Sequence, residues 1–466
     1  MRLWSSRSTL AQRIAQHIQR GEPISLASVP AATITRVLLD GPSQPGGRQL
    51  LCLRAAHITG ALNLRHASLS FPLVFESCTF DEPVTVEDGH LRVLEFRSCT
   101  LPAFEGQALR VAGDLTLIDT RVGRIDLFSA RVGGQLWLNN SHVDCGEIGW
   151  AVSAPQIGIA GGCYANGLTV RGGLNLWGAD IQAGLELGRA ILFAEDRPAL
   201  RAPNLSVTGD VTLGDGATIS GAVNLSSVKI GGCLTLNYRV TGEHKIIISN
   251  SDIKTLHLEV SPPEHVTVDL TGCVVTSFLD TPRSWPKMLK LDRTRYETLR
   301  PLLPARERLA WLKRNEDSNS PQPYEQLARQ YREAGQDYDA RTILLAKHRN
   351  RTRHLRFPAK LWGYLQDVTI GYGYRPVRAM AWLAGLTMIV AVSSTVWQPR
   401  PVTGAAPDFN FAAYALDVVL PILDLGQEKS YSAVGFGRGL VWIAIIAGWL
   451  LASTIITAVT RNISRS

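Results

Sequence analysis

The chain has 466 residues, with 48 Lys and Arg against 40 Asp and Glu and a formal net charge of +8. This mild positive excess is compatible with contact to anionic lipid or polyanions, but it does not specify such a partner without clustering. The seven cysteines are an odd number and form no CxxC pair, which argues against a disulfide framework and predicts free thiols in a reducing compartment. Residues 1–20 contain no apolar segment typical of a cleavable signal peptide, so none is expected.

Two short helices are predicted before the repetitive part of the chain. Apolar residues recur at every fourth position from Leu10 to Ile18, and Gly21 follows as a helix C-cap. A second helix is expected within residues 25–39. We therefore assign residues 1–49 to an N-terminal helical cap.

Residues 50–282 are repetitive and predict a β-solenoid. Apolar residues fall five apart, as in Leu117, Val122, Leu127 and Val132. A helix cannot use this spacing because successive apolar residues would rotate around its surface, whereas a coil of short strands can place one inward residue on each side. Cys78 and Cys99 lie about one four-sided coil apart, so we expect them to stack in the interior. The predicted fold is mainly β, a right-handed solenoid of about ten coils.

Several segments resemble a group of bacterial membrane-associated pentapeptide-repeat-like β-solenoid proteins. Phrases that begin at Ala67, Ala130 and Ala179 look like degenerate pentapeptide repeats of the form A(D/N)LXX. Longer segments are also similar to that group, and they begin at Leu51, Pro323, Gly371 and Leu420. Some members are labelled automatically as membrane-associated oxidoreductases, but the function of the group is not established. The resemblance therefore implies an architecture, a solenoid joined to a membrane segment.

Residues 283–370 are assigned to a helical linker. The stretch 283–320 predicts a linker with a partial helix, and 323–360 predicts a TPR-like helical hairpin broken at Gly335. The second helix leads into a basic segment, 341–360, which has no acidic residue. Its cations either meet anionic lipid headgroups or neutralise the phosphates of a nucleotide or oligonucleotide ligand; the candidates are Lys347, Arg349, Arg351, Arg353, Arg356 and Lys360.

Residues 371–466 predict a transmembrane domain. The uncharged runs 379–397 and 439–460 are long enough to cross a hydrocarbon core of about 30 Å. Residues 411–425 form a shorter apolar helix that either re-enters the membrane or lies on its surface. Lys and Arg are more frequent outside the two runs than in the loop between them. The positive-inside rule therefore places both termini and the solenoid in the cytoplasm, at a bacterial inner membrane.

The predicted membrane domain offers several candidate site residues. Small residues spaced four apart predict close helix packing, and they are Ala381, Gly385, Ala444, Gly448 and Ala452. Asp417 and Asp424 either form acidic rings at the mouth of a pore or cap and solvate the short helix. Val434–Gly437 is similar to the centre of a potassium filter, which makes Gly435 and Gly437 pore-lining candidates, although no pore helix directly precedes them.

The sequence contains no HExxH, P-loop, GxSxG or zinc-type motif. We therefore expect no enzyme activity, no metal site and no cofactor. Two functions fit the predicted architecture. One is a homo-oligomeric pore, provisionally a tetramer, that the cytoplasmic solenoid regulates, by analogy with bacterial antiviral effectors. The alternative is a membrane-anchored scaffold whose solenoid docks protein partners, without a pore.

Overall fold

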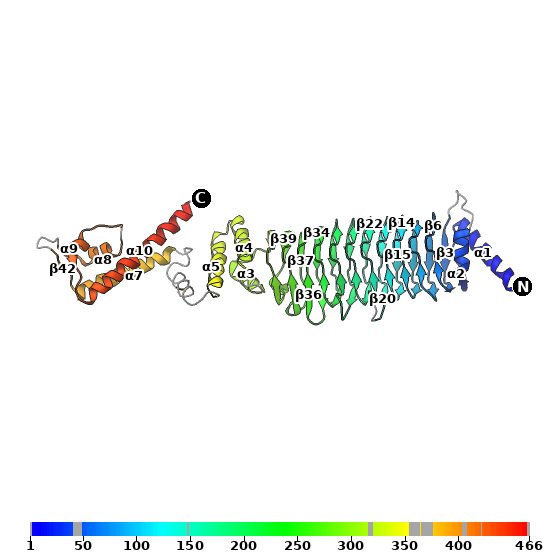
Figure 1. Ribbon diagram of the computed structural model, residues 1–466, viewed down its shortest axis with the longest axis horizontal. Helices are drawn as coiled ribbons and strands as arrows, with labels where there is room; N and C mark the ends of the chain where they lie inside the picture. Colours follow the sequence, from blue (N-terminus) through cyan, green and yellow to red (C-terminus); the bar gives the residue numbers. More distant parts are fainter. Residues whose placement is uncertain are drawn as a thin grey trace. The chain divides into compact units, whose positions relative to one another are not determined.

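The computed structural model divides the chain into two compact units, Met1–Gln326 and Leu327–Ser466 (Figure 1). The first unit holds a β-solenoid capped by helices, and the second is helical. The residues that the structure describes are 2–40, 49–146, 149–315, 320–353, 364, 376–402, 408–420 and 422–463.

The predicted β-solenoid is confirmed, with about 11 coils of parallel strands. Four strands make one coil, so that β10 (His90–Leu91) pairs with β14 (Arg110–Val111) of the next coil. The first face continues with β6 (Ser68–Leu69), β18 (Arg131–Val132), β22 (Gly158–Ile159), β26 (Asp180–Ile181) and β30 (Ser206–Val207). The second face holds β1 (Ile24–Ser25), β3 (Leu51–Arg54), β7 (Leu73–Glu76), β11 (Leu94–Arg97), β15 (Leu115–Ile118), β19 (Leu136–Trp137), β23 (Cys163–Tyr164), β27 (Leu185–Glu186) and β31 (Val211–Leu213).

Longer strands join these two faces in the last coils, and they are β34 (Lys229–Leu236), β37 (Asp252–Leu258), β39 (Val274–Leu279) and β41 (Arg295–Arg300). The third face consists of β2 (Ser28–Pro30), β4 (His57–Thr59), β8 (Thr79–Phe80), β12 (Thr100–Leu101), β16 (Arg121–Val122), β20 (His142–Asp144), β24 (Thr169–Arg171), β28 (Ile191–Phe193), β32 (Thr218–Ser220) and β35 (Arg239–Val240). The fourth face consists of β5 (Leu62–Asn63), β9 (Val84–Thr85), β13 (Phe104–Glu105), β17 (Ile125–Asp126), β21 (Val152–Ser153), β25 (Leu174–Asn175), β29 (Leu200–Arg201), β33 (Val223–Asn224), β36 (His244–Ile247), β38 (Val266–Asp269) and β40 (Met288–Lys290).

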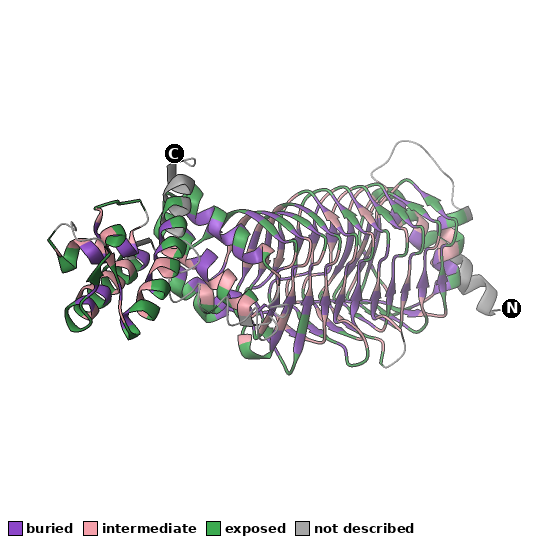
Figure 2. Cartoon of the chain, turned by 60° about the vertical axis from the view of Figure 1, so that its left-hand side comes forward, coloured by how far each residue is buried: buried purple, intermediate pink, exposed green. Residues whose placement is uncertain are grey.

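The corners depend on residues that tolerate a left-handed backbone. Ser98, Asp119 and Asn140 occupy the same corner of successive coils, with φ between +52° and +54°. Short polar side chains are favoured there because they can form local hydrogen bonds in this conformation. Each tight corner turns the chain by one side of the coil, so that short strands place buried side chains in the interior from every side (Figure 2).

A ladder of small polar side chains runs through the interior beside one corner. The backbone N–H of Cys78 donates to Sγ of Cys99 at 3.4 Å, and the N–H of Cys99 donates to Oγ1 of Thr120 at 3.4 Å. The N–H of Thr120 then donates to Oγ of Ser141 at 3.0 Å. The predicted stacking of Cys78 and Cys99 is therefore confirmed, and the ladder satisfies backbone donors that the corner leaves out of the sheets.

The solenoid begins earlier and ends later than its sequence pattern indicates. Between α1 (Arg2–Arg20) and α2 (Ala31–Asp40), the short strands β1 and β2 already pair with the next coil. The helix expected within 25–39 therefore begins only at Ala31. At the other end, part of the stretch assigned to a linker forms β40 and β41. The five-residue spacing fades in these terminal coils because helices supply part of their packing.

A buried ion pair lies at the C-terminal end of the solenoid. Arg308 of α3 (Ala305–Leu312) is fully buried, and its Nη1 and Nη2 lie 2.8 and 2.7 Å from the carboxylate oxygens of Asp280. The indole Nε1 of Trp285 donates to the same carboxylate at 3.0 Å. The guanidinium also lies over the rings of Trp285 and Trp311. These contacts compensate both charges where the last coil ends.

Two helices follow the solenoid, α4 (Gln322–Glu333) and α5 (Asp337–Arg353). Gly335 lies between them with φ +73°, in agreement with the predicted break.

The remaining elements are η1 (Pro263–His265), η2 (Pro282–Ser284), α7 (Pro376–Val396), β42 (Arg400–Pro401), α8 (Phe411–Val419), α9 (Gln427–Ser430), β43 (Tyr431–Ser432) and α10 (Phe436–Ile463). The short helix predicted over 411–425 ends at Val419 because Leu420 precedes a proline and adopts an extended backbone.

His244 gives the solenoid a predictable dependence on pH. Its Nε2 lies 3.0 Å from the hydroxyl of Tyr238, and burial lowers its pKa to about 4, from an ordinary value near 6.5. Above pH 6.5 the ring is mostly neutral in the folded and in the unfolded chain. Between pH 6.5 and 4 the unfolded chain binds a proton at this ring, whereas the folded chain does not. The free energy of unfolding should therefore fall by up to about 2 kcal/mol from pH 7 to pH 5. Chemical unfolding followed by β-sheet circular dichroism measures this, and His244→Gln should flatten the dependence; an unchanged pH dependence in the variant would contradict it.

Candidate functional site

The short helix α8 packs between the two long apolar helices α7 and α10. Its buried residues Tyr414, Ala415, Val418 and Val419 form one cluster with Val390 of α7 and Ala444 of α10. Asn410 begins α8 as an N-cap, since its side-chain oxygen accepts hydrogen bonds from the N–H groups of Ala412 and Ala413. The helix is thus fixed at its start by a cap and along its length by apolar packing.

The end of α8 lies against the middle of α10. A Cβ atom built on Gly448 would overlap the carbonyl oxygen of Val419, so only glycine permits this approach. Gly448 follows Phe436, the first residue of α10, by twelve residues, which corresponds to about 18 Å along the helix. The C-terminal end of α8 therefore reaches well into the apolar length of α10.

Asp417 holds the segment after α8 in place by hydrogen bonds. This residue is only 5% exposed, and its two carboxylate oxygens accept hydrogen bonds from the N–H groups of Leu425 and Glu428, both at 2.8 Å. Such charge-assisted bonds are stronger than bonds between neutral groups. We call residues 422–430 the return loop.

Gln427 provides a second attachment for the return loop. It is 7% exposed; its amide nitrogen donates to the carbonyl oxygen of Asp408 at 3.2 Å, and its amide oxygen accepts from the N–H of Asn410 at 3.3 Å. Gly426 precedes it with φ +75°, a conformation that favours glycine. The loop therefore starts near the end of α8 and comes back to its beginning.

Asp424 differs from Asp417 because it faces solvent. Its carboxylate forms an ion pair with Lys429 and accepts a hydrogen bond from the N–H of Gly426 at 3.2 Å. These contacts lower the pKa of Asp424 from its usual range. The carboxylate of Asp417 is buried and holds the return loop by hydrogen bonds. Of the two candidate carboxylates, only that of Asp424 lies at the surface of the chain.

The other candidates of the predicted membrane domain separate into buried and exposed groups. Ala444, Gly448 and Ala452 lie on the buried side of α10, whereas Ala381 and Gly385 are exposed on α7. Gly437 is buried in the first turn of α10 beside Trp397, and Gly435 is exposed with φ +60°. The filter-like Val434–Gly437 therefore belongs to the start of α10 and not to the return loop.

Both long helices expose apolar side chains. By length and composition, Arg378–Val396 and Phe436–Ser453 could each cross a membrane, and only 22% of each segment is buried. Large side chains on their outer faces include Met380, Trp382, Met388, Ile389, Val392, Phe436, Trp442, Ile443, Ile446, Trp449 and Leu450. A surface of this kind requires either lipid or a partner to cover it.

The basic segment is described only in part. Arg349 and Arg351 are exposed on α5 and Lys347 is half-buried. The side chain of Arg353, and Arg356 and Lys360 as a whole, lie outside the described residues. The proposed anion or lipid site at this segment therefore stays a prediction.

Sequence reasoning did not identify Asn410, Gln427 or the close approach at Gly448 to Val419. An Asn just before an apolar run is a signal for a helix start, whereas Gln427 has no local signal because its partners precede it by many residues. Among the described residues, no group of three or more His, Cys, Asp or Glu could hold a metal ion. Comparison of the chain with protein-family models, curated proteins and solved structures finds no match.

Replacing Asp417 should release the return loop. Asp417→Asn puts an amide NH₂ where an oxygen now accepts, so at least one hydrogen bond is lost, worth about 1.5–3 kcal/mol. Amide hydrogen exchange of Leu425 and Glu428, measured by mass spectrometry, should accelerate by about tenfold or more. Asp424→Asn is the matched control and should leave both amides protected. Equal effects of the two substitutions would contradict the assignment.

Replacing Gly448 should separate α8 from α10. Gly448→Ala places a methyl group into the carbonyl oxygen of Val419, with a cost of about 1–3 kcal/mol. Hydrogen exchange should increase in residues 411–419 while α10 stays helical. Gly439→Ala is the control in the same helix, because nothing lies within 4 Å of a Cβ built there. The close approach is contradicted if both variants exchange like the parent protein.

Proposed function

We propose that the chain is a bacterial inner-membrane protein whose C-terminal unit assembles, as a tetramer, into a channel-like pore regulated by the solenoid. The observation that carries this proposal is the position of the C-terminal end of α8, from which the return loop starts, beside the middle of α10. The two long helices supply the spans, and their exposed apolar faces suit contact with lipid. The proposal also extends the resemblance to membrane-associated pentapeptide-repeat-like solenoids.

The return loop is the reason to propose an assembly. Backbone outside helices is tolerated at membrane depth only where protein buries it or where it lines a water-filled cavity. The return loop of a single chain exposes three apolar side chains, those of Ile422, Leu423 and Leu425. It also exposes the ion pair of Asp424 with Lys429. Several copies that meet at this loop would cover the apolar side chains and enclose a polar path.

The proposed topology leaves both termini and the solenoid in the cytoplasm. Cations before α7 and after α10 support it through the positive-inside rule. A solenoid on that side can receive an intracellular signal, for which we propose a nucleotide or oligonucleotide, as in antiviral defence. The chemistry expected of the chain is ion passage, not catalysis.

A scaffold without a pore is the second candidate. The solenoid exposes two pairs of large apolar side chains that a protein partner would cover, Phe128 and Trp177 after strands of the fourth face, and Ile191 and Phe193 on β28 of the third face. In that case, α7 and α10 would only anchor the chain.

Bilayer recording with the purified full chain tests the pore. We expect discrete conductance steps, with a cation preference that Asp424→Asn reduces because it removes the exposed carboxylate. Gly439→Ala serves as the control that leaves conductance and preference unchanged. Native mass spectrometry of the same sample should give a tetramer. A monomer that inserts into the bilayer and conducts nothing contradicts the pore and favours the scaffold.

A further inference from the structure

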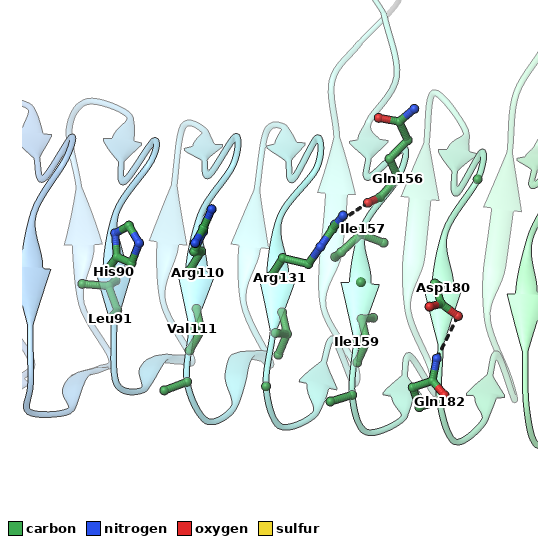
Figure 3. A pocket seen from close by; sticks show the side chains of 16 residues that line it. His90, Leu91, Arg110, Val111, Arg131, Gln156, Ile157, Ile159, Asp180 and Gln182 are labelled. Carbon is green, nitrogen blue, oxygen red and sulfur yellow. Dashed lines mark hydrogen bonds between the residues drawn. The ribbon is translucent and has the colours of Figure 1, made fainter.

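One histidine and two arginines stand in register on the first face of the solenoid. His90 of β10, Arg110 of β14 and Arg131 of β18 are direct partners in successive coils (Figure 3), so they repeat about every 4.8 Å. Like charges directly opposite each other destabilise a sheet. Some other exposed arginines of the solenoid are paired with carboxylates, as in Arg54–Glu76, Arg65–Glu87 and Arg97–Glu95. Within the described part of the chain, neither Arg110 nor Arg131 forms an ion pair.

The guanidinium of Arg131 is held in a fixed position. Its Nη1 donates to the carbonyl oxygens of Gln156 at 2.7 Å and Ala130 at 3.0 Å. The side chain lies over Gly158, where a built Cβ would come within 2.9 Å of Cδ of Arg131. Nη1 is thus occupied, while the edge formed by Nε and Nη2 has no hydrogen bond among the described residues. That edge offers two parallel donors, the arrangement that binds a phosphate in bidentate fashion.

His90, Arg110 and Arg131 line a groove of about 740 Å³. Its lining includes the small residues Ala112, Gly133 and Ala160, which leave room for a ligand beside the backbone. The volume is in the range typical of small-molecule sites. Among the described lining residues there is no Phe, Tyr or Trp, so we do not base recognition of a nucleobase on stacking with these side chains.

The two ends of the groove differ in charge. Asp180 lies in register with Gly158, two coils beyond Arg131, or about 10 Å away. Its carboxylate accepts a hydrogen bond from Nε2 of Gln182 at 3.0 Å, and its other oxygen is available to a hydroxyl donor. One end therefore suits phosphates, and the other suits the hydroxyl groups of a sugar.

We propose that this groove binds a phosphorylated ribose ligand, a nucleotide or a short oligonucleotide, with its phosphates on Arg110 and Arg131 and a ribose hydroxyl on Asp180. The site differs from the basic segment at 341–360. The regulatory meaning of this binding rests on the proposed function, but the binding itself does not, because it is measured without ion flux. A failure of binding and an absence of conductance are therefore separate results.

Isothermal titration of the full chain in detergent tests the site with three probes: ATP, a short oligoadenylate and inorganic tripolyphosphate. Arg110→Gln with Arg131→Gln should weaken all probes that bind by about tenfold or more, since each charged hydrogen bond contributes at least that factor. Arg110→Gln alone should act in the same direction, and it removes no hydrogen bond of the fold. Arg239→Gln with Lys245→Gln removes two exposed charges on other faces and should change affinity less than twofold.

Asp180→Asn separates the two ends of the groove. It should weaken ATP or oligoadenylate severalfold and should not weaken tripolyphosphate, which has no sugar hydroxyl group and is favoured by the loss of a negative charge. Tighter binding of oligoadenylate than of ATP identifies an oligonucleotide as the ligand, and the reverse identifies a nucleotide. The inference is overturned if no probe binds, if the control pair weakens binding as much as the Arg110 and Arg131 pair, or if Asp180→Asn affects tripolyphosphate equally.

Discussion

In-register hydrogen bonding between successive coils is the constraint on which the solenoid depends. No coil satisfies its own backbone, so each one requires a neighbour above and below. The ladder from Cys78 to Ser141 shows that even the corners follow this rule. The ends must then be closed by other means, which α1 and α2 do at one end and α3 at the other. At the second end, losing one partner of the buried Arg308–Asp280 pair would leave an uncompensated charge, at a cost of about 3–5 kcal/mol.

The same register that stacks the core also arranges the surface. An outward side chain has its counterpart about 4.8 Å away in the next coil, so each face carries columns of side chains. Some columns pair opposite signs, as Arg54 does with Glu76 and Arg65 with Glu87, which removes repulsion at little energetic gain. The column of His90, Arg110 and Arg131 contains no such pair. Gly158 occupies the next position of the column, and the side chain of Arg131 lies over it. An anion bound between Arg110 and Arg131 would relieve this repulsion, which is why the repeat geometry supports the proposed ligand site.

The sequence predicts the interior of the solenoid well because its signal is local. Leu117, Val122, Leu127 and Val132 follow the five-residue spacing, and all four are buried. The pattern weakens where packing is not repetitive. The first coil, which includes Ile24, packs against helices, and the last coil ends on Arg308, so neither needs the regular spacing. Gln427 could not be found from sequence, because its partners Asp408 and Asn410 are brought near only by the folded loop.

Asp417 and Asp424 show most clearly what the sequence could not decide. Both are carboxylates in one apolar segment, and local spacing gives no reason to separate them. Folding does so through burial, because a carboxylate removed from water requires donors, and only Asp417 has two backbone N–H groups within reach. Asp424 keeps its solvation and pairs with Lys429. An acidic ring in an assembly of this chain would therefore consist of Asp424, and Lys429 beside each carboxylate would moderate its charge and hence its preference for cations.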